Sequence, residues 1–442
     1  MSFIPQQALM QAAGYIDTYY SRTLPDQGLR PVLQGEVDCD VCVVGAGLAG
    51  INTAYGLSER GQNNLIVIDE HRIGWGASGR NGGFVAKGYS AGEAELAERL
   101  GLEPAQRLVA LTQQGRQIIR DRITRHQIDC GPLTPGVLTV SWQNRPGVFA
   151  AKVEEANRNF SLGLEYWPME KVRDHCRTER YFDGVFSPHD FQFHSLRYVH
   201  GLAQVVEQRG GKIFENSKAL AITQEGSFWR VKTPEGSVRA RQIVVCCSIY
   251  AQGLEPRLER AAFPVQTYVM VTDPLDPVDL AGSINTSHAI YDTRFASDYY
   301  RVLPDRRIMW GGRVGLWAPP HNLSALMFRD LLKVYPQLAG KTQPQMAWSG
   351  LLCYAPHKMP QIGELAPGYW YNMGFGGHGL VPTTVGGEVV AAALTGTDQN
   401  YKLFAPFGLS YAGGRLGRYV AQLVYWGWRG RDILEGLKEA RV

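Results

Sequence analysis

The feature that most constrains the fold of this chain is a strand–loop–helix–strand pattern close to its start. An apolar run at 40–44 leads into Gly45-Ala46-Gly47-Leu48-Ala49-Gly50, and apolar residues at helical spacing follow. A second apolar run at 65–68 is closed by Asp69. Short apolar runs are typical of strands buried on both faces of a sheet, so the pattern predicts one β–α–β unit.

The three glycines of this loop fit the spacing G-x-G-x-x-G, and each has a physical role in binding a dinucleotide. Gly45 allows the tight turn, Gly47 lets backbone approach a pyrophosphate, and Gly50 lets helix and strand pack closely. Backbone amides at the helix start then face the phosphates. Asp69 lies 19 positions after Gly50, where a carboxylate accepts hydrogen bonds from ribose hydroxyls. These features predict a dinucleotide site.

The kind of dinucleotide has to be chosen on other grounds. A pyridine-nucleotide disulfide reductase would show a second such unit and a redox cysteine pair, and no second strand–GxGxxG–helix unit is present. Cys39 and Cys42 form a C-x-x-C pattern, but they fall inside the first predicted strand, on opposite faces. We therefore interpret them as packed strand residues and expect no metal site.

A second loop of small residues follows Asp69 almost directly and runs Arg72-Ile-Gly-Trp-Gly-Ala-Ser-Gly-Arg-Asn-Gly-Gly83. So many small residues allow a wide turn whose amides can surround a pyrophosphate and the edge of a flavin. A plain flexible loop has the same composition. The position directly behind the ribose acid favours binding.

These motifs together resemble the D-amino-acid oxidase and glycine oxidase superfamily of FAD enzymes. The closest likeness is to the bacterial γ-glutamylputrescine oxidase-like subgroup, and it extends over nearly the whole chain. The further motifs that carry it are Tyr19-Tyr20, Gln242–Ser248, Arg307–Arg313, Trp348–Gly350, Met359–Gly363, Gly374–Gly379 and the segment from Phe407 to Asp432.

The resemblance implies FAD in an extended conformation and a bipartite α/β fold. We expect a Rossmann-like FAD-binding domain with a doubly wound, mixed sheet, and an α+β substrate domain built on an antiparallel sheet. The FAD-binding domain is expected at 37–110, 195–262 and 345–400 and the substrate domain at 111–194 and 263–344. Residues 1–36 form a lead-in, and residues 401–442 form a tail.

By position, the resemblance also implies which residues contact FAD. Those expected are Gly45, Ala46, Gly47, Gly50, Asp69, Glu70, Ser78, Gly79, Arg80, Asn81, Gly82, Gly83, Ala219, Gly376, Gly377, His378, Gly379 and Leu380. The turn at 376–379 is expected at the pyrimidine end of the flavin, where amide donors or a helix start stabilise negative charge. Cys353 is close to where some relatives attach flavin covalently, but its spacing to Met359-Pro360 favours a buried, unreactive thiol.

The substrate wall is expected on the predicted antiparallel sheet. Its candidates are Tyr268, Tyr299, Tyr300, Arg301, Trp310, Trp348 and Tyr354, of which Tyr268, Tyr300, Arg301 and Trp348, with His378, are the predicted catalytic-site residues. Arg301 is the candidate for binding a carboxylate, since a guanidinium does so bidentately. It falls near, not on, the position of the carboxylate-binding arginine of the amino-acid oxidases, and a structural arginine is the alternative. No lysine follows His378-Gly379, unlike in sarcosine-oxidase relatives.

Composition limits the kinds of partner that the protein is expected to bind and the cellular compartment in which it is expected. Lys and Arg number 45 against 41 Asp and Glu, too small an excess to indicate nucleic-acid binding. Seven scattered cysteines do not suggest a disulfide framework. No signal-like start and no run of 18 apolar residues is present, so we expect a cytoplasmic protein. The basic aromatic segment 415–431 is expected to pack on the protein, with contact to a membrane surface as the lesser alternative.

The expected function is therefore FAD-dependent oxidation of a C–N bond. The substrate would be a small amine or amino acid, such as a polyamine-like, γ-glutamylated or secondary amine, giving an imine and H₂O₂ with oxygen as acceptor. One alternative is a dehydrogenase that passes electrons to a quinone or carrier. Another is a non-catalytic FAD-binding partner subunit. The exact substrate and the oligomeric state stay open.

Overall fold

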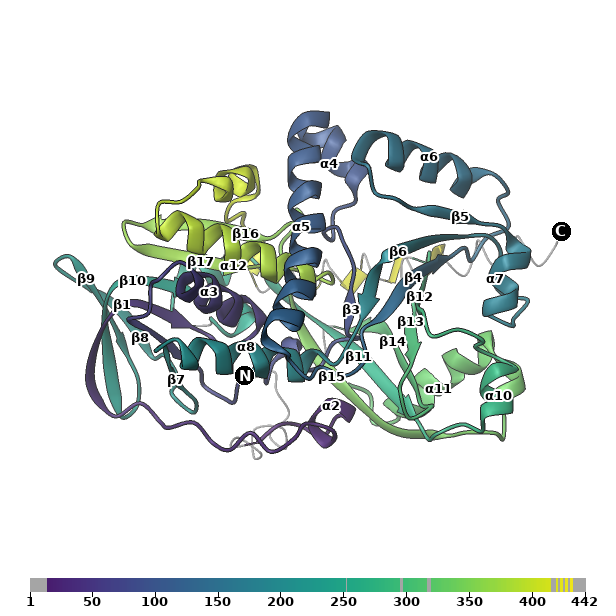
Figure 1. The fold of residues 1–442 in the computed structure, drawn as a ribbon, viewed down its shortest axis with the longest axis horizontal. Coiled ribbons are helices and arrows are strands. Elements are labelled where there is room, and N and C mark those ends of the chain that lie inside the picture. Colours follow the sequence, from purple (N-terminus) through teal and green to yellow (C-terminus); the bar gives the residue numbers. More distant parts are fainter. Residues whose placement is uncertain are drawn as a thin grey trace.

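The computed structural model describes residues 14–251, 253–294, 297–315 and 319–414, together with residues 419, 422, 423, 426, 427, 430 and 431. Two β-sheets form the frame, one in each half of the molecule (Figure 1). The long helix α5 (Leu102–His126) stands between the two halves, and its buried face packs into the main hydrophobic cluster.

Among the described residues, the first sheet has eight strands and is parallel at its centre. β1 (Gly35–Val44) pairs in parallel with β10 (Gly236–Val245) on one side and with β2 (Leu65–Ile68) on the other. The other strands are β7 (Lys212–Phe214) beside β2, β17 (Tyr369–Met373) and β16 (Gln361–Ala366) beyond β10, and the hairpin β8 (Ala221–Glu225) and β9 (Phe228–Lys232). Because parallel strands end at the same edge, the loops after β1, β2 and β10 lie together.

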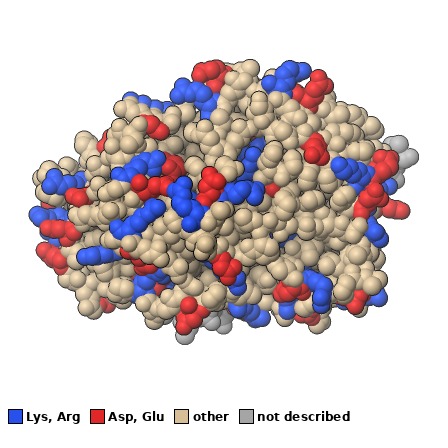
Figure 2. Space-filling model, viewed as in Figure 1, with Lys and Arg blue, Asp and Glu red and all other residues tan. Residues whose placement is uncertain are grey.

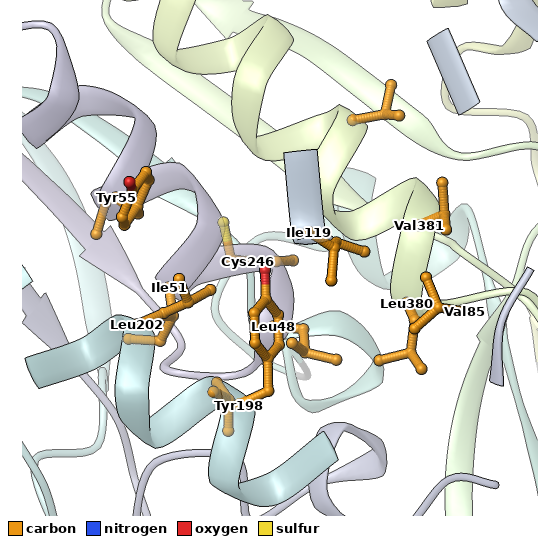
Figure 3. Packing of buried hydrophobic residues seen from close by; sticks show 14 of the residues in the cluster. Leu48, Ile51, Tyr55, Val85, Ile119, Tyr198, Leu202, Cys246, Leu380 and Val381 are labelled. Atoms are coloured by element: carbon orange, nitrogen blue, oxygen red, sulfur yellow. The ribbon is translucent and has the colours of Figure 1, made fainter. Parts of the chain in front are cut away.

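Three helices cover this sheet and share one hydrophobic cluster with it. They are α3 (Leu48–Glu59), α8 (Ser195–Gln208) and α12 (Leu380–Leu394). Figure 3 shows Leu48 and Ile51 of α3 packed among Leu202 of α8 and Val381 of α12. Nearly every residue of α3 is buried, which is expected for a helix enclosed on all sides.

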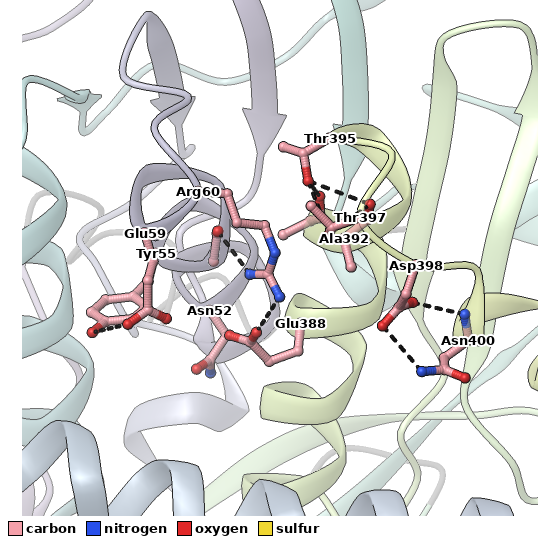
Figure 4. Close-up of polar contacts among 12 residues, drawn as sticks. Asn52, Tyr55, Glu59, Arg60, Glu388, Ala392, Thr395, Thr397, Asp398 and Asn400 are labelled. Atoms are coloured by element: carbon pink, nitrogen blue, oxygen red, sulfur yellow. Dashed lines mark hydrogen bonds and ion pairs between the residues drawn. The ribbon is translucent and has the colours of Figure 1, made fainter.

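Polar contacts fix α3 against α12 (Figure 4). The guanidinium of Arg60, at the end of α3, donates to Glu388 Oε2 across 2.9 Å. Arg122 of α5 donates to Asn52 Oδ1 across 2.8 Å and also pairs with Glu388. A Cβ on Gly387 would lie 2.6 Å from the carbonyl carbon of Asn52, so the two helices touch through backbone. This packing sets the distance between the first glycine loop, from which α3 starts, and the turn at 376–379, from which α12 starts.

The second sheet has nine strands within the described part of the chain. In order they are β15 (Pro344–Tyr354), β11 (Phe263–Thr272), β14 (Ile308–Gly315), β13 (Tyr299–Val302), β12 (Ala289–Asp292), β4 (Thr134–Val140), β6 (Gly184–Gln192) and β3 (Phe84–Val85), with β5 (Glu165–Trp167) on β6. The pairings are antiparallel except for the parallel pair β4 and β12. Helix α11 (Leu323–Val334) packs against β11, β14 and β15.

The remaining described helices lie around these two layers. The α-helices are α2 (Tyr19–Arg22), α4 (Glu93–Leu100), α6 (Val148–Phe160), α7 (Met169–His175), α9 (Pro256–Arg260) and α10 (Pro277–Ala281). Short 3₁₀ turns occur at η1 (Ala77–Gly79), η2 (Ser248–Tyr250), η3 (Pro336–Leu338) and η4 (Asn400–Phe407).

The observed elements differ from the sequence-based expectation in a few places. The start of the Gln242–Ser248 motif is the last part of the long strand β10. Helix α12 begins at Leu380, directly after the Gly374–Gly379 motif. The sheets also cross the expected domain limits, since β3 and β15 pair in the second sheet although their residues fall in segments expected for the FAD-binding domain. Cys39 and Cys42 lie buried in β1 as free thiols.

On the face shown in Figure 2, basic and acidic side chains are interspersed. No helix within the described residues combines the length and the apolar character needed to cross a membrane. Of the tail segment singled out in the sequence, Arg415, Leu416, Arg418 and Arg429 lie outside the described residues, whereas Tyr419, Leu423 and Trp426 are each more than half exposed.

Candidate active site

A cavity of about 1120 Å³ lies between the first sheet and the second. On one side its lining includes Val44 and Ile68, at the ends of β1 and β2, and Cys246 just after β10. On the other side it is lined by residues of β11, β14 and β15. Open α/β sheets bind ligands in this position, outside the carboxyl ends of their strands.

The first glycine loop forms one wall of this cavity. Gly45 and Gly47 line it. Gly45 has φ +109°, and a Cβ there would lie 2.9 Å from backbone atoms of Cys246 and Cys247. A Cβ on Gly50 would lie 1.8 Å from the carbonyl oxygen of Gly45, so only glycine lets α3 start this close to the loop.

Asp69 is buried and ties two loops together. Its Oδ2 accepts a hydrogen bond from the N–H of Ala46 across 2.6 Å, and its Oδ1 accepts one from that of His71 across 2.8 Å. Burial raises the pKa of Asp69 to about 7, against the lowering effect of these two donors. Next to it, Lys218 Nζ lies 2.8 Å from Glu70 Oε1, and both residues line this end of the cavity.

The second glycine loop is held by hydrogen bonds to its neighbours. Ser78 Oγ accepts from the N–H of Leu48, the first residue of α3, across 2.8 Å. Arg80 Nε donates to the carbonyl of Trp75 across 2.7 Å, and the guanidinium lies 4.1 Å above that indole ring. Trp348 Nε1 donates to the carbonyl of Arg80 across 2.9 Å. Arg80 Nη2 is buried, with no hydrogen-bond partner among the described residues. Since Arg80 also lines the cavity, this donor suits an anionic ligand oxygen.

The turn that precedes α12 closes the other end of the cavity. Ser90 Oγ accepts hydrogen bonds from the N–H groups of Gly377 and His378, across 3.1 and 3.4 Å. Gly379 is the N-cap of α12, so the positive end of this helix dipole meets the cavity. Burial lowers the pKa of His378, although Glu93 acts in the opposite direction. The lowered pKa favours a neutral imidazole.

The structure brings most of the predicted cofactor residues together. Those that line the cavity are Gly45, Gly47, Asp69, Glu70, Ser78, Arg80, Asn81, Gly82, Gly83, Ala219, Gly376, Gly377, His378, Gly379 and Leu380. Ala46, Gly50 and Gly79 lie behind this lining. A Cβ on Gly79 would lie 2.5 Å from the carbonyl oxygen of Gly74, so Gly79 serves the packing of the loop. Narrow glycine walls, an unpaired guanidinium donor and a helix start together fit an extended dinucleotide such as FAD.

The predicted substrate wall is only partly in the cavity. Tyr299 and Tyr354 line it. Tyr300 lies on the opposite side of β13 from Tyr299, because successive side chains of a strand alternate. It stacks on Trp310 with ring centroids 4.4 Å apart, in a hydrophobic cluster that also contains Tyr268. Tyr268, Tyr300, Trp310 and Trp348 are therefore outside the cavity lining.

Arg301 is also outside the cavity lining. Its guanidinium is buried and donates to Gln192 Oε1 across 3.0 Å, to Tyr20 Oη across 2.9 Å and to the carbonyl of Phe193 across 3.1 Å. It lies directly behind Gly83, where a Cβ would come within 2.8 Å of Arg301 Nη2. These contacts support the alternative reading of Arg301 as a structural arginine.

Other side chains that line the cavity were not singled out from the sequence. They include Phe84, Tyr291, Lys358, Tyr411 and Gln422, and also Arg313, which the sequence analysis named only as the end of a motif. Arg313 stands in the Arg307–Arg313 motif, directly after Gly311 and Gly312. A long cationic side chain behind two glycines of an interior strand is the signal that could have identified it. Among the described lining residues, Asp69 and Glu70 are the acids, and both belong to the end of β2.

Comparisons with known proteins agree with this geometry. The family model described as DAO, FAD dependent oxidoreductase, matches residues 40–393. Gamma-glutamylputrescine oxidoreductase from Escherichia coli (strain K12) is 32% identical over 398 residues, covering 88% of this chain and 92% of that protein. The predicted family resemblance is thereby confirmed.

Solved structures show the same fold at low identity. Glycine oxidase from Geobacillus kaustophilus has a TM-score of 0.71 at 18% identity, covering 84% of this chain and 98% of that chain. L-proline dehydrogenase from P. horikoshii has a TM-score of 0.70 at 16% identity, covering 86% and 100%. These similarities confirm the predicted fold class. From the family model and the length of the match, this chain belongs to the DAO family of FAD-dependent oxidoreductases.

Proposed function

We propose that this protein oxidises the C–N bond of a secondary amine or an amino acid, using FAD bound in the cavity between the two sheets. The observation that carries the proposal is the continuity of this cavity. It runs from the glycine loops and Asp69 past the turn at 376–379 to the face of the second sheet. One end suits a dinucleotide, and the other leaves room for a small substrate beside the flavin.

The substrate class is supported by what the relatives are named for. They include a gamma-glutamylputrescine oxidoreductase, a glycine oxidase and an L-proline dehydrogenase. Each of these names denotes oxidation of a compound with a C–N bond. Bound flavin supplies the hard chemistry of this reaction class, accepting a hydride from the carbon next to nitrogen and then passing two electrons to oxygen or another acceptor.

The chain's own residues supply position and electrostatics. In the proposal, the N–H groups at the start of α3 and the buried donor of Arg80 hold the pyrophosphate, while Asp69 and Glu70 hold the ribose. The start of α12 lies where negative charge grows on the flavin as the substrate is oxidised. The substrate amine must be neutral to lose a hydride, and the absence of acids from the described lining beyond Asp69 and Glu70 favours this state.

Aromatic side chains form the substrate's apolar surroundings. All of them lie on strands of the second sheet, namely Phe84 on β3, Tyr291 on β12, Tyr299 on β13 and Tyr354 on β15. The Phe84 and Tyr299 rings meet edge to face with centroids 5.7 Å apart. Such a wall excludes water from the carbon that is oxidised and contacts the methylene groups of the substrate.

The test uses the FAD-loaded protein without oxygen. It is mixed with a panel of secondary amines, diamines and amino acids, and the visible absorbance of oxidised flavin is followed. We expect bleaching by at least one member, followed by release of one H₂O₂ per imine when air is admitted. Bleaching without peroxide, but with rapid reduction of a quinone dye, indicates the dehydrogenase instead. Bleaching by no member supports a non-catalytic FAD-binding subunit and overturns the proposal.

A further inference from the structure

The C-terminal segment of the chain contributes to the cavity, although it lies beyond the residues that the family model matches. That match ends at residue 393. Further along the chain, the residues that line the cavity are Tyr411, Ala412, Gly413 and Gln422. The N–H of Ala412 donates to the carbonyl of Arg260 across 2.8 Å. Since Arg260 ends α9 shortly before β11 begins, this hydrogen bond places the start of the segment beside a strand that lines the cavity.

The chain turns after this contact and returns to the cavity on a helix. Gly413 has φ +79° and Gly414 has φ +52°, left-handed conformations that glycine adopts without strain. Gln422 and Leu423 are helical. Leu423 is 62% exposed and lies outside the cavity lining, whereas Gln422 is buried and belongs to it. Of these two neighbours, Gln422 is therefore the one that faces inward.

The carboxamide of Gln422 makes no hydrogen bond within the part of the chain that the structure describes, although only 6% of the residue is exposed. A carboxamide has two N–H donors and a carbonyl acceptor, and buried groups of this kind are almost always paired. Because Gln422 lines the cavity, a ligand bound there can supply the partner that the protein does not.

The place of the C-terminal segment favours the substrate over FAD as this partner. The residues proposed for FAD lie in the loops after β1 and β2 and in the turn before α12. The C-terminal segment starts beside β11 of the second sheet. Phe263 of β11 stacks on Tyr354, a member of the aromatic substrate wall, with ring centroids 6.3 Å apart.

We infer that Gln422 is a specificity-determining residue that binds an amide group of the substrate. The inference rests on the proposed function and narrows it to a preference for amines that also carry an amide. A carboxamide offers a donor and an acceptor side by side, and a second amide satisfies both at once. A carboxylate uses only the donor and an ammonium group only the acceptor, so each leaves half of this buried group unpaired.

The test measures the binding of an amide that has no amine to be oxidised. N-butylacetamide and methyl pentyl ketone, which has a methylene group in place of the amide N–H, are titrated separately into the FAD-loaded protein, and the change in flavin absorbance is followed. Gln422→Met keeps the size of the side chain and removes its polar atoms. We expect it to weaken binding of the amide by about tenfold and of the ketone by at most about threefold, because the amide loses two hydrogen bonds and the ketone one.

Leu423→Ala is the matched control, because Leu423 is adjacent, exposed and outside the cavity lining. It is expected to leave both affinities unchanged, and FAD content and thermal unfolding show whether each variant is folded. The inference is overturned by equal binding of N-butylacetamide to wild type and Gln422→Met, by no binding to wild type, by an equal loss for both ligands, or by a loss of FAD from Gln422→Met. None of these results depends on turnover, so failure of the flavin-bleaching panel with intact amide selectivity counts against the proposed function alone.

Discussion

The guanidinium of Arg301 donates a hydrogen bond to the hydroxyl oxygen of Tyr20 across 2.9 Å, between residues 281 positions apart. The same guanidinium holds the carbonyl of Phe193, whose own N–H donates to the carbonyl of Gly83 across 3.1 Å. Arg301 therefore joins the lead-in helix α2 to the loop that carries Gly82 and Gly83, which line the cavity. This role is to position the loop, and it does not involve contact with the substrate.

Replacing these two residues should affect stability and FAD binding together. Tyr20→Phe removes two buried hydrogen bonds, one accepted from Arg301 and one donated to Met309 Sδ, and is expected to cost about 1 to 2 kcal/mol of unfolding free energy. Arg301→Leu leaves three buried acceptors without a donor and is expected to cost about 2 to 4 kcal/mol. Thermal unfolding and FAD titration measure both effects. A selective loss of flavin bleaching by the amine panel in Arg301→Leu, with stability and FAD affinity intact, would show that Arg301 contacts the substrate after all.

Gly50→Ala should abolish tight FAD binding. Its Cβ would lie 1.8 Å from the carbonyl oxygen of Gly45, so α3 has to move away from the loop, at a cost of about 3 kcal/mol or more. Gly92→Ala is the control, because a Cβ there meets nothing within 4 Å and its φ is −71°. The flavin-to-protein absorbance ratio after gel filtration reports the result. Retention of FAD by Gly50→Ala at the level of Gly92→Ala would contradict this packing.

Acid should destabilise the protein through two buried histidines of the α8 region. Burial, with Arg197 and Arg301 nearby, lowers the pKa of His194 to about 3, and burial, with Arg30 and Arg72 nearby, lowers that of His200 to about 3. Both values lie below the ordinary value of about 6.5, so both rings stay neutral in the fold and gain protons on unfolding. Their contribution to stability is therefore complete above about pH 6.5, and it is lost as the pH falls from there toward 3.

The expected slope is up to about 2.7 kcal/mol per pH unit when both protons are taken up. Denaturant unfolding at a series of pH values measures it. The double variant His194→Gln, His200→Asn should flatten the slope, whereas His189→Asn, at an exposed position, should not. An unchanged slope in the double variant would assign the acid sensitivity to other groups.

FAD should be held without a covalent bond to Cys353. This cysteine lines the cavity, but burial raises the pKa of its thiol to about 11, so little thiolate is present to attack the flavin. Precipitating the holoprotein with acid is expected to release all of the flavin into the supernatant. Yellow colour that stays with the pellet in wild type and leaves it in Cys353→Ala would show a covalent link.

The cofactor half of the site was predictable because its chemistry is local in the sequence. Gly45, Gly47 and Gly50 are within six positions of one another, and Asp69 ends the next strand of the same unit. Each of these residues has a backbone or carboxylate role that the spacing alone specifies. The structure places Gly45, Gly47 and Asp69 at the cavity lining and Gly50 directly behind it.

The substrate half was not predictable in the same way, because it depends on which side chains of each strand face the cavity. Arg301 and Arg313 lie on neighbouring strands of one sheet, and the sequence favours Arg301 by its nearness to an expected position. The partner that fixes Arg301, Tyr20, is remote in sequence. The bulge that places Arg313 at the cavity shifts the pairing by a single residue, and alternation of polar and apolar residues carries no mark of such a shift.

The central claim is that this cavity joins an FAD site to a site where the C–N bond of a small amine or amino acid is oxidised. The most direct test is a single-turnover, anaerobic reaction of the FAD-loaded protein with N-butylglycine, and with the same compound carrying deuterium on the carbons next to nitrogen. We predict that N-butylglycine bleaches the flavin and that the deuterium slows the bleaching. A flavin that stays oxidised with N-butylglycine and with every other member of the amine panel, or bleaching at the same rate with and without deuterium, would contradict the claim.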